Sequence, residues 1–333
     1  MLALVLGARL LPEDFRLFAR GATLFALVQI SFSAFDVLLG QRYPLWGYWL
    51  EGGYRSANSL LSDEFFRGQG LASHSIVYSL CVLLGISFVL TNAVKFKQSL
   101  RVLVGAGLIF GLIISGTRSA VLAAIIVVTI YGFLEVRRVS QKLMFALGMF
   151  VLGAYFLQAS NAVKFVDSLA ADLFGSASYT HRLDGLNAVG DVASDRGLLG
   201  LLFGQGGASV SDLFARGFLQ QDGLAVVDNQ LVTTFIVGGF IGISALSLCV
   251  IAGLLARRSV GVAMAALFIM MFSFDVLTWP AGVLLLYSIT GSSLSVGRSE
   301  RVASGSRTRR RRTSHHAAGQ QRHLTSSTEG RRS

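Results

Sequence analysis

The chain has 333 residues, of which 53% are hydrophobic and only 14% are charged, and its mean hydropathy is +0.62. Soluble domains carry about 25% charged residues, so this composition excludes a water-soluble globular protein. Its apolar content also excludes disorder over most of the chain. The two cysteines, Cys81 and Cys249, lie inside apolar runs and form no pattern typical of a disulfide framework or a zinc site. We therefore predict an all-α, polytopic membrane protein.

The net charge of +11 is concentrated at the carboxyl end. Residues 298–333 hold ten arginines against Glu300 and Glu329, which gives this segment a charge of +8 and leaves +3 for the rest. Its composition predicts a basic, disordered cytoplasmic tail after a membrane domain that covers residues 1–297. The arginines either bind anionic lipid headgroups or only enforce topology, and nucleic-acid binding is a weaker alternative.

The apolar runs predict a bundle of about eight membrane spans. A helix needs about 20 apolar residues to cross the hydrocarbon core, and about 17 can suffice. The runs of roughly this length or longer are Gly21 to Gly40, Ser75 to Val94, Val102 to Leu134, Leu143 to Gln158, Leu231 to Ala256 and Val260 to Val296. Two of them are too long for one span, and we divide these at the polar sequence SGTRS (Ser115 to Ser119) and near Asp275 and Trp279-Pro280. Met1 to Ala8 has the composition of the end of a further span.

The basic loops predict which ends of the spans are cytoplasmic. Lys and Arg gather in five places: Arg9 to Arg20, Lys95 to Arg101, Arg137 to Lys142, Arg257-Arg258 and the tail. With eight spans all five fall on one side, which is then cytoplasmic. Residues 161–228 form a large loop on the other side, with four basic residues against eight aspartates. Its start, residues 161–175, predicts an amphipathic helix that lies against the bilayer or caps the bundle.

Arg118 is the sharpest candidate for chemistry in the apolar part. An arginine in or beside a span is costly and usually faces a polar cavity. Ser115, Thr117 and Ser119 supply hydroxyls beside it, and the next helix presents free N–H groups at its start. The turn therefore predicts an anion pocket. The alternative is a plain turn whose arginine reaches the interface.

Polar residues at the other outer boundaries leave two interpretations open. Asp228-Asn229 stands where the large loop re-enters the membrane, as a functional pair or as a helix N-cap. His74 opens a span in the same way. In the loop, His181-Arg182 is either functional or ordinary exposed sequence, and the glycine-rich run Gly197 to Gly207 is as typical of a tight loop as of a binding loop.

Five of these elements, in this order, resemble one family. They are RGQGLASHS (Arg67 to Ser75), SGTRSAVLA (Ser115 to Ala123), THRLDGLNAV (Thr180 to Val189), GLLFGQGG (Gly200 to Gly207) and VDNQLVTTFIVGGFIG (Val227 to Gly242). With two further spans after them, the chain from Pro12 to Val296 is similar to the O-antigen ligase and O-antigen polymerase family of bacterial membrane glycosyltransferases.

The resemblance implies a GT-C-like fold in the bacterial cytoplasmic membrane, with the active site on the extracytoplasmic side. It implies transfer of a glycan from an undecaprenyl-diphosphate carrier to a glycan or glycolipid acceptor, without nucleotide sugar, cofactor or metal. Arg118 and Arg182 match the arginines that engage the donor diphosphate, and we add Arg67 and Asn229 to the predicted substrate-binding residues. The ligases carry a histidine where this chain has Asp228.

An acceptor hydroxyl needs a base near its proton. Asp228 is the first candidate for this catalytic role and His74 the second. Polymerase and ligase differ only in the acceptor, which leaves both open. The alternative function is a flippase or transporter of lipid-linked oligosaccharide, but transporters often contain an internal repeat and polar residues at the membrane midplane. This sequence has no such repeat, and its polar residues cluster on the outer side.

Overall fold

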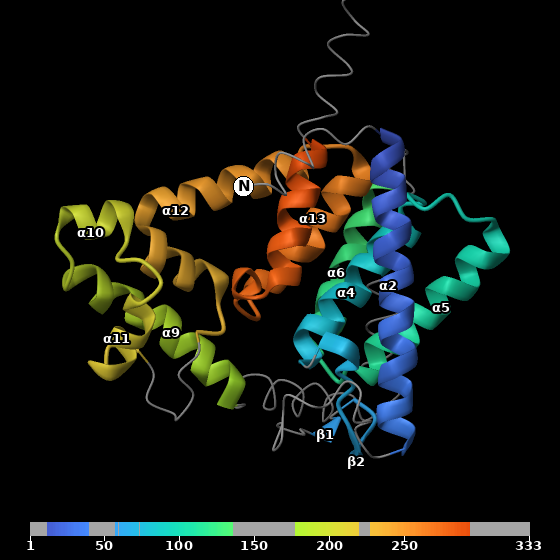
Figure 1. Cartoon of the computed structure of the whole chain (residues 1–333), viewed down its shortest axis with the longest axis horizontal. Helices are drawn as coiled ribbons and strands as arrows, with labels where there is room; N and C mark the ends of the chain where they lie inside the picture. Colours follow the sequence, from blue (N-terminus) through green and yellow to red (C-terminus); the bar gives the residue numbers. More distant parts are fainter. Residues whose placement is uncertain are drawn as a thin grey trace, which may run out of the picture.

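The computed structural model describes residues 12–39, 57–58, 60–72, 74–135, 177–219 and 227–293 (Figure 1). This part of the chain is mostly helical, in agreement with the predicted all-α class. Its only sheet, within those ranges, is a pair of short antiparallel strands, β1 (Ala57–Asn58) and β2 (Ser62–Phe66). The predicted span Leu143 to Gln158, the predicted helix over 161–175 and the tail over 298–333 lie outside the described residues.

A helical bundle is built around α4 (Ser75–Leu90). Every residue of α4 from Ser75 to Val89 is buried, as expected for a helix that is apolar on all sides. Four helices pack on it: α2 (Pro12–Leu39), α5 (Gln98–Ile114), α6 (Arg118–Glu135) and α13 (Arg258–Met271). The core between them is formed by large side chains such as Tyr78, Leu83, Phe88, Met264 and Leu267, each at most 1% exposed.

A second, smaller lobe lies beside the bundle (Figure 1). It contains α9 (Ala177–Ser194), α10 (Leu198–Phe203), α11 (Ser209–Ala215) and the first part of α12 (Gln230–Leu254). A separate hydrophobic cluster holds these helices together, formed by Ala188, Val192, Leu213, Leu219, Val227, Val232, Phe235 and Ile236. α12 continues from this lobe into the bundle, where Leu246 and Val250 join the main core.

Two helices of the described chain are long and apolar enough to cross a membrane, Phe15–Leu38 in α2 and Gln230–Leu254. The apolar helices α4, α5, α13 and Arg118–Phe133 in α6 are shorter. α5 ends at Ile114 and α6 begins at Arg118, so the long run from Val102 is broken at the polar turn as predicted. The run from Val260 is also broken: α13 ends at Met271, a 3₁₀ turn η2 (Val276–Thr278) follows, and a further helix covers 280–293.

Basic side chains gather at one end of the bundle. Arg20 donates to Val94 O at 2.9 Å, and Arg101 donates to Leu90 O at 2.7 Å, which ties the loop after α4 to α2 and α5. Arg258 pairs with Glu135 at the end of α6. The strands β1 and β2 lie at the opposite end (Figure 1). The antiparallel helices therefore separate the basic loops from the segment that carries Arg67 and His74.

Candidate functional site

The turn between α5 and α6 is held by the last residue of β1 and by the segment that follows β2. The last carbonyls of a helix have no partner within it. Here the Asn58 amide donates to Ile114 O at 2.9 Å and to Ile113 O at 3.3 Å, and Gly68 N donates to Ile114 O at 2.9 Å. Gly116 then turns the chain with φ +60°, and a Cβ there would meet the Asn58 side chain at 2.8 Å. Asn58 and Gly68 thus cap the C-terminal end of α5.

Arg67 lies across this turn. Its Nε donates to Ser115 O at 3.3 Å and its Nη2 donates to Thr117 Oγ1 at 3.0 Å. Arg118, half-buried, is the next residue and the first of α6. Two arginines from distant parts of the sequence therefore meet at one helix start. Guanidinium groups beside the first N–H groups of a helix form a strongly anion-attracting place.

His74 caps the neighbouring helix next to this turn. Its Nδ1 accepts from Ile76 N at 3.3 Å, and Thr117 Oγ1 donates to Ser75 O at 3.3 Å. The imidazole centroid lies 5.5 Å from the Trp279 ring. Burial and the charge of Arg67 lower the pKa of His74 below its usual 6.5, while the charge of Asp228 opposes them. His74 is therefore within electrostatic reach of both Arg67 and Asp228.

Asp228 and Asn229 play different parts at the start of α12. Asn229 is the N-cap: its side-chain oxygen accepts from Leu231 N at 2.9 Å and Val232 N at 3.4 Å. The N-cap alternative therefore applies to Asn229, which is 2% exposed. Asp228 stands one residue before the cap and is half-buried. The cap orients the backbone there without using the Asp228 carboxylate.

Asp275 belongs to the same region, although it enters the sequence analysis only as the place where a long apolar run is divided. Gln230 accepts from Leu277 N at 2.6 Å, which attaches η2 to the start of α12. Burial raises the pKa of Asp275 from its ordinary 3.8, and hydrogen bonds from Thr278 and Thr233 oppose this. Its Oδ1 is buried without a hydrogen-bond partner among the described residues. A single acid in an apolar run has no spacing pattern, so sequence reasoning did not select it.

The glycine-rich run of the large loop has a structural role. α12 is broken at Gly239, where φ is +60°. Near the break, Arg196 Nη1 donates to Phe235 O at 3.4 Å and to Ile236 O at 3.1 Å. The backbone N–H of Gln205 donates to Ile236 O at 3.2 Å, and that of Gly206 donates to Val237 O at 3.1 Å. Carbonyls released by a helix break need such partners. The tight-loop interpretation of this run is the one the contacts support.

Arg182 lies in α9, which begins at Ala177. His181-Arg182 therefore belongs to a helix within the large loop. α9 belongs to the smaller lobe, whereas Arg118 belongs to the bundle. A joint diphosphate site of Arg118 and Arg182 stays a prediction.

Of the predicted residues, the fold gathers five toward one end of the bundle: Arg67, His74, Arg118, Asp228 and Asn229. Cations on one side and a carboxylate on the other are suited to bind an anion and to accept a proton nearby. Comparison of the chain with protein-family models, with curated proteins and with solved structures gave no match.

Proposed function

We propose that this chain is a membrane glycosyltransferase that moves a glycan from a polyprenyl-diphosphate carrier to a sugar hydroxyl outside the cytoplasmic membrane. The observation that supports it best is the convergence of Arg67 and Thr117-Arg118 with His74 and Asp228. These residues come from three separate segments, and the end of the bundle that they occupy is opposite to the basic loops. Basic loops mark the cytoplasmic side of membrane proteins.

The residues suit the chemistry of such a transfer. The acceptor hydroxyl oxygen forms a bond to the anomeric carbon while the bond from that carbon to the diphosphate oxygen breaks, with inversion. The departing diphosphate takes the electron pair, and Arg67 and Arg118 stabilise its charge. The Asp228 carboxylate takes the hydroxyl proton, and His74, held neutral by its surroundings, is the alternative acceptor. No step requires a metal or a nucleotide sugar.

The test is transfer by the purified full chain. Supplied with a polyprenyl-diphosphate-linked glycan and an acceptor glycan, the protein should release free polyprenyl diphosphate and lengthen the acceptor. Arg118→Ala should abolish both products, while Arg16→Ala, on α2 away from the site, should not. The outcome that would contradict the proposal is movement of an intact lipid-linked glycan across a vesicle membrane with no bond cleaved. That result would support the flippase alternative.

A deletion strain separates the two kinds of transferase. Single repeat units on the lipid carrier should accumulate if the chain is a polymerase. Full-length lipid-linked polymer should accumulate if it is a ligase.

A further inference from the structure

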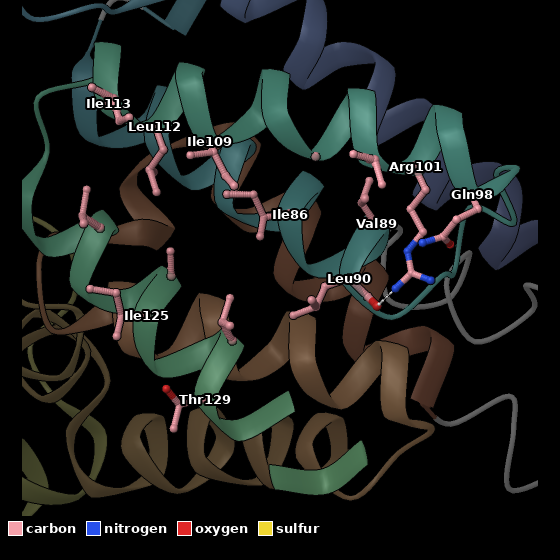
Figure 2. Close-up of a pocket in the computed structure, with 15 residues that line it drawn as sticks. Ile86, Val89, Leu90, Gln98, Arg101, Ile109, Leu112, Ile113, Ile125 and Thr129 are labelled. Carbon is pink, nitrogen blue, oxygen red and sulfur yellow. Dashed lines mark hydrogen bonds between the residues drawn. The ribbon is translucent and has the colours of Figure 1, made fainter. Parts of the chain in front are cut away.

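α5 and α6 enclose an apolar groove on the side of the bundle away from the smaller lobe. α5 leans outward from the other helices (Figure 1), which leaves a cavity of about 720 Å³ between α4, α5 and α6. Aliphatic side chains point into it from all three helices, among them Ile86, Ile109, Leu112 and Ile125 (Figure 2). It runs from Gln98 to Ile113, which at 1.5 Å per residue is about 22 Å. Half of the hydrocarbon core is about 15 Å thick, so the groove is long enough for an acyl chain.

The two ends of this groove differ in charge. At the end near the start of α5, Arg101 and Gln98 form the wall together (Figure 2). Lys95 and Lys97 are exposed in the loop just before α5. At the other end, the lining that the structure describes is aliphatic, with Leu112, Ile113 and Val121. An occupant with an apolar chain and an anionic head would therefore place its head beside Arg101.

Arg101 is fixed in position for such a head. Its Nη2 donates to Leu90 O at 2.7 Å, which holds the guanidinium over the end of α4 at the mouth of the groove. A guanidinium carries five N–H donors, so this one bond leaves capacity for phosphate oxygens. Arginine favours phosphate because its planar fork can donate two parallel hydrogen bonds.

We propose that the groove binds one anionic phospholipid of the cytoplasmic leaflet, with an acyl chain along α5 and the phosphate on Arg101. Lys95 and Lys97 add long-range attraction for the head, about a fivefold gain in affinity for each basic residue near the surface. The site requires that the bundle lies in a membrane but does not depend on glycosyl transfer. Its lipid would tie the outward-leaning α5 to the rest of the bundle.

The experiment uses the purified full chain, stripped of lipid and mixed with phosphatidylglycerol or phosphatidylcholine of identical acyl chains. Native mass spectrometry counts the lipids retained. The wild type should retain phosphatidylglycerol at least about fivefold better. Arg101→Gln should remove this preference, whereas Arg257→Gln, which removes an exposed charge from the same end of the bundle outside the groove, should keep it.

A second pair of variants tests whether the acyl chain of the lipid lies along α5. A Cβ at Gly105 would have Val89 Cγ1 at 3.9 Å as its nearest neighbour, so Gly105→Leu fills the groove without a backbone clash and should reduce retention of both lipids. Gly21→Leu, in open space on α2, should not.

Equal retention of both phospholipids by the wild type would overturn the proposal. So would displacement of phosphatidylglycerol by undecaprenyl phosphate, which would assign the groove to a polyprenyl chain. Thermal unfolding of each variant shows whether it is folded. If Gly105→Leu does not fold, the comparison of Arg101→Gln with Arg257→Gln decides whether the proposal holds. Flotation of the wild type with vesicles shows separately whether the chain is embedded in a membrane.

Discussion

Arg67 donates through Nη2 to Thr117 Oγ1 at 3.0 Å and through Nε to Ser115 O at 3.3 Å. One side chain therefore joins the segment after β2 to the turn between α5 and α6. Thr117 Oγ1 in turn donates to Ser75 O at 3.3 Å, the first residue of α4. The start of α4, the start of α6 and Arg67 consequently form one hydrogen-bonded unit.

Arg67→Lys tests whether this unit serves transfer. Lysine keeps the charge but loses the two-pronged geometry that contacts Ser115 and Thr117, so we expect most of the transfer activity to be lost and Arg67→Ala to lose all of it. Arg118→Lys and Arg182→Lys should likewise rescue only part of the loss in their alanine variants. Activity is measured as released polyprenyl diphosphate. Normal transfer by Arg67→Ala at normal expression would remove Arg67 from the site.

The pH dependence should report on His74. Its Nδ1 accepts a hydrogen bond from Ile76 N, which a protonated ring cannot do. Since the folded pKa of His74 lies below 6.5, the unfolded chain takes up this proton first. The contribution to stability is therefore complete above 6.5 and decreases as the pH falls through the folded pKa. We expect the unfolding temperature to begin to fall below pH 6.5, and the transfer rate to fall only as the pH reaches the lower folded pKa of His74.

Substitutions of Asp228 and Arg67 should shift the acid limb, the fall of stability at low pH that His74 causes, in opposite directions. Asp228→Asn removes a charge that raises the pKa of His74, so the limb should shift to lower pH. Arg67→Gln removes a charge that lowers it, so the limb should shift to higher pH. The unfolding temperature of each variant is followed against pH, because this readout does not require transfer activity. An unchanged limb in His74→Asn, which can still cap α4, would assign the titration to another group.

Local signals in the sequence predicted part of this arrangement. The polar sequence SGTRS breaks an apolar run too long for one helix, and α5 and α6 are indeed separate there. His74 and Asn229 precede apolar runs, and both are N-caps. The contact of Asn58 and Arg67 with that turn joins residues about 50 positions apart, and no short-range pattern encodes such a pairing. The sequence does not predict the break in α12 either, because VGGFIG continues an apolar run, and the packing of Gly204 against Val237 joins positions far apart in the chain.

Substitutions of glycine should show whether the contact between the glycine-rich run and the break in α12 contributes to stability. Gly204 and Gly239 have φ of +71° and +60°, and added Cβ atoms would meet Val237 O and Leu201 O. Gly204→Ala and Gly239→Ala should each cost about 1–3 kcal/mol from the backbone alone, with a further loss from these contacts. Gly207→Ala is the matched control, since nothing lies near its Cβ position. Equal thermal stability of all three variants would refute the packing of the glycine-rich run against the break in α12.

The sidedness of the molecule can be tested with two matched serines. In a chain with Cys81 and Cys249 replaced by Ala, Ser211→Cys marks α11 and Ser99→Cys marks the start of α5, and both positions are exposed. We expect an impermeant thiol reagent to label the Ser211→Cys protein in intact cells and the Ser99→Cys protein only after lysis. The reverse pattern would place the candidate site in the cytoplasm and exclude the proposed transfer outside.

Substitutions of Asp228 and Asn229 should separate an effect on transfer from an effect on stability. Asn229 caps α12 through Leu231 N and Val232 N, whereas Asp228 makes no contribution to that cap. Asn229→Ala should therefore lower stability by about 1 kcal/mol. Asp228→Asn should leave thermal unfolding nearly unchanged and reduce transfer by about 10²- to 10⁴-fold, because an amide keeps the shape but cannot take a proton.

Asp228→His tests whether a different proton acceptor can replace the carboxylate at this position. Imidazole can accept a proton near neutral pH, so this variant should retain part of the activity and should gain a dependence on pH between about 5 and 8. Asn229→Asp is the matched control, because aspartate caps a helix as well as asparagine does and should preserve stability. If Asp228→Asn transferred glycan at the wild-type rate, the base would have to be another group. His74 would then be the first to examine, and Asp275 the second, because both are partly buried at the same end of the bundle.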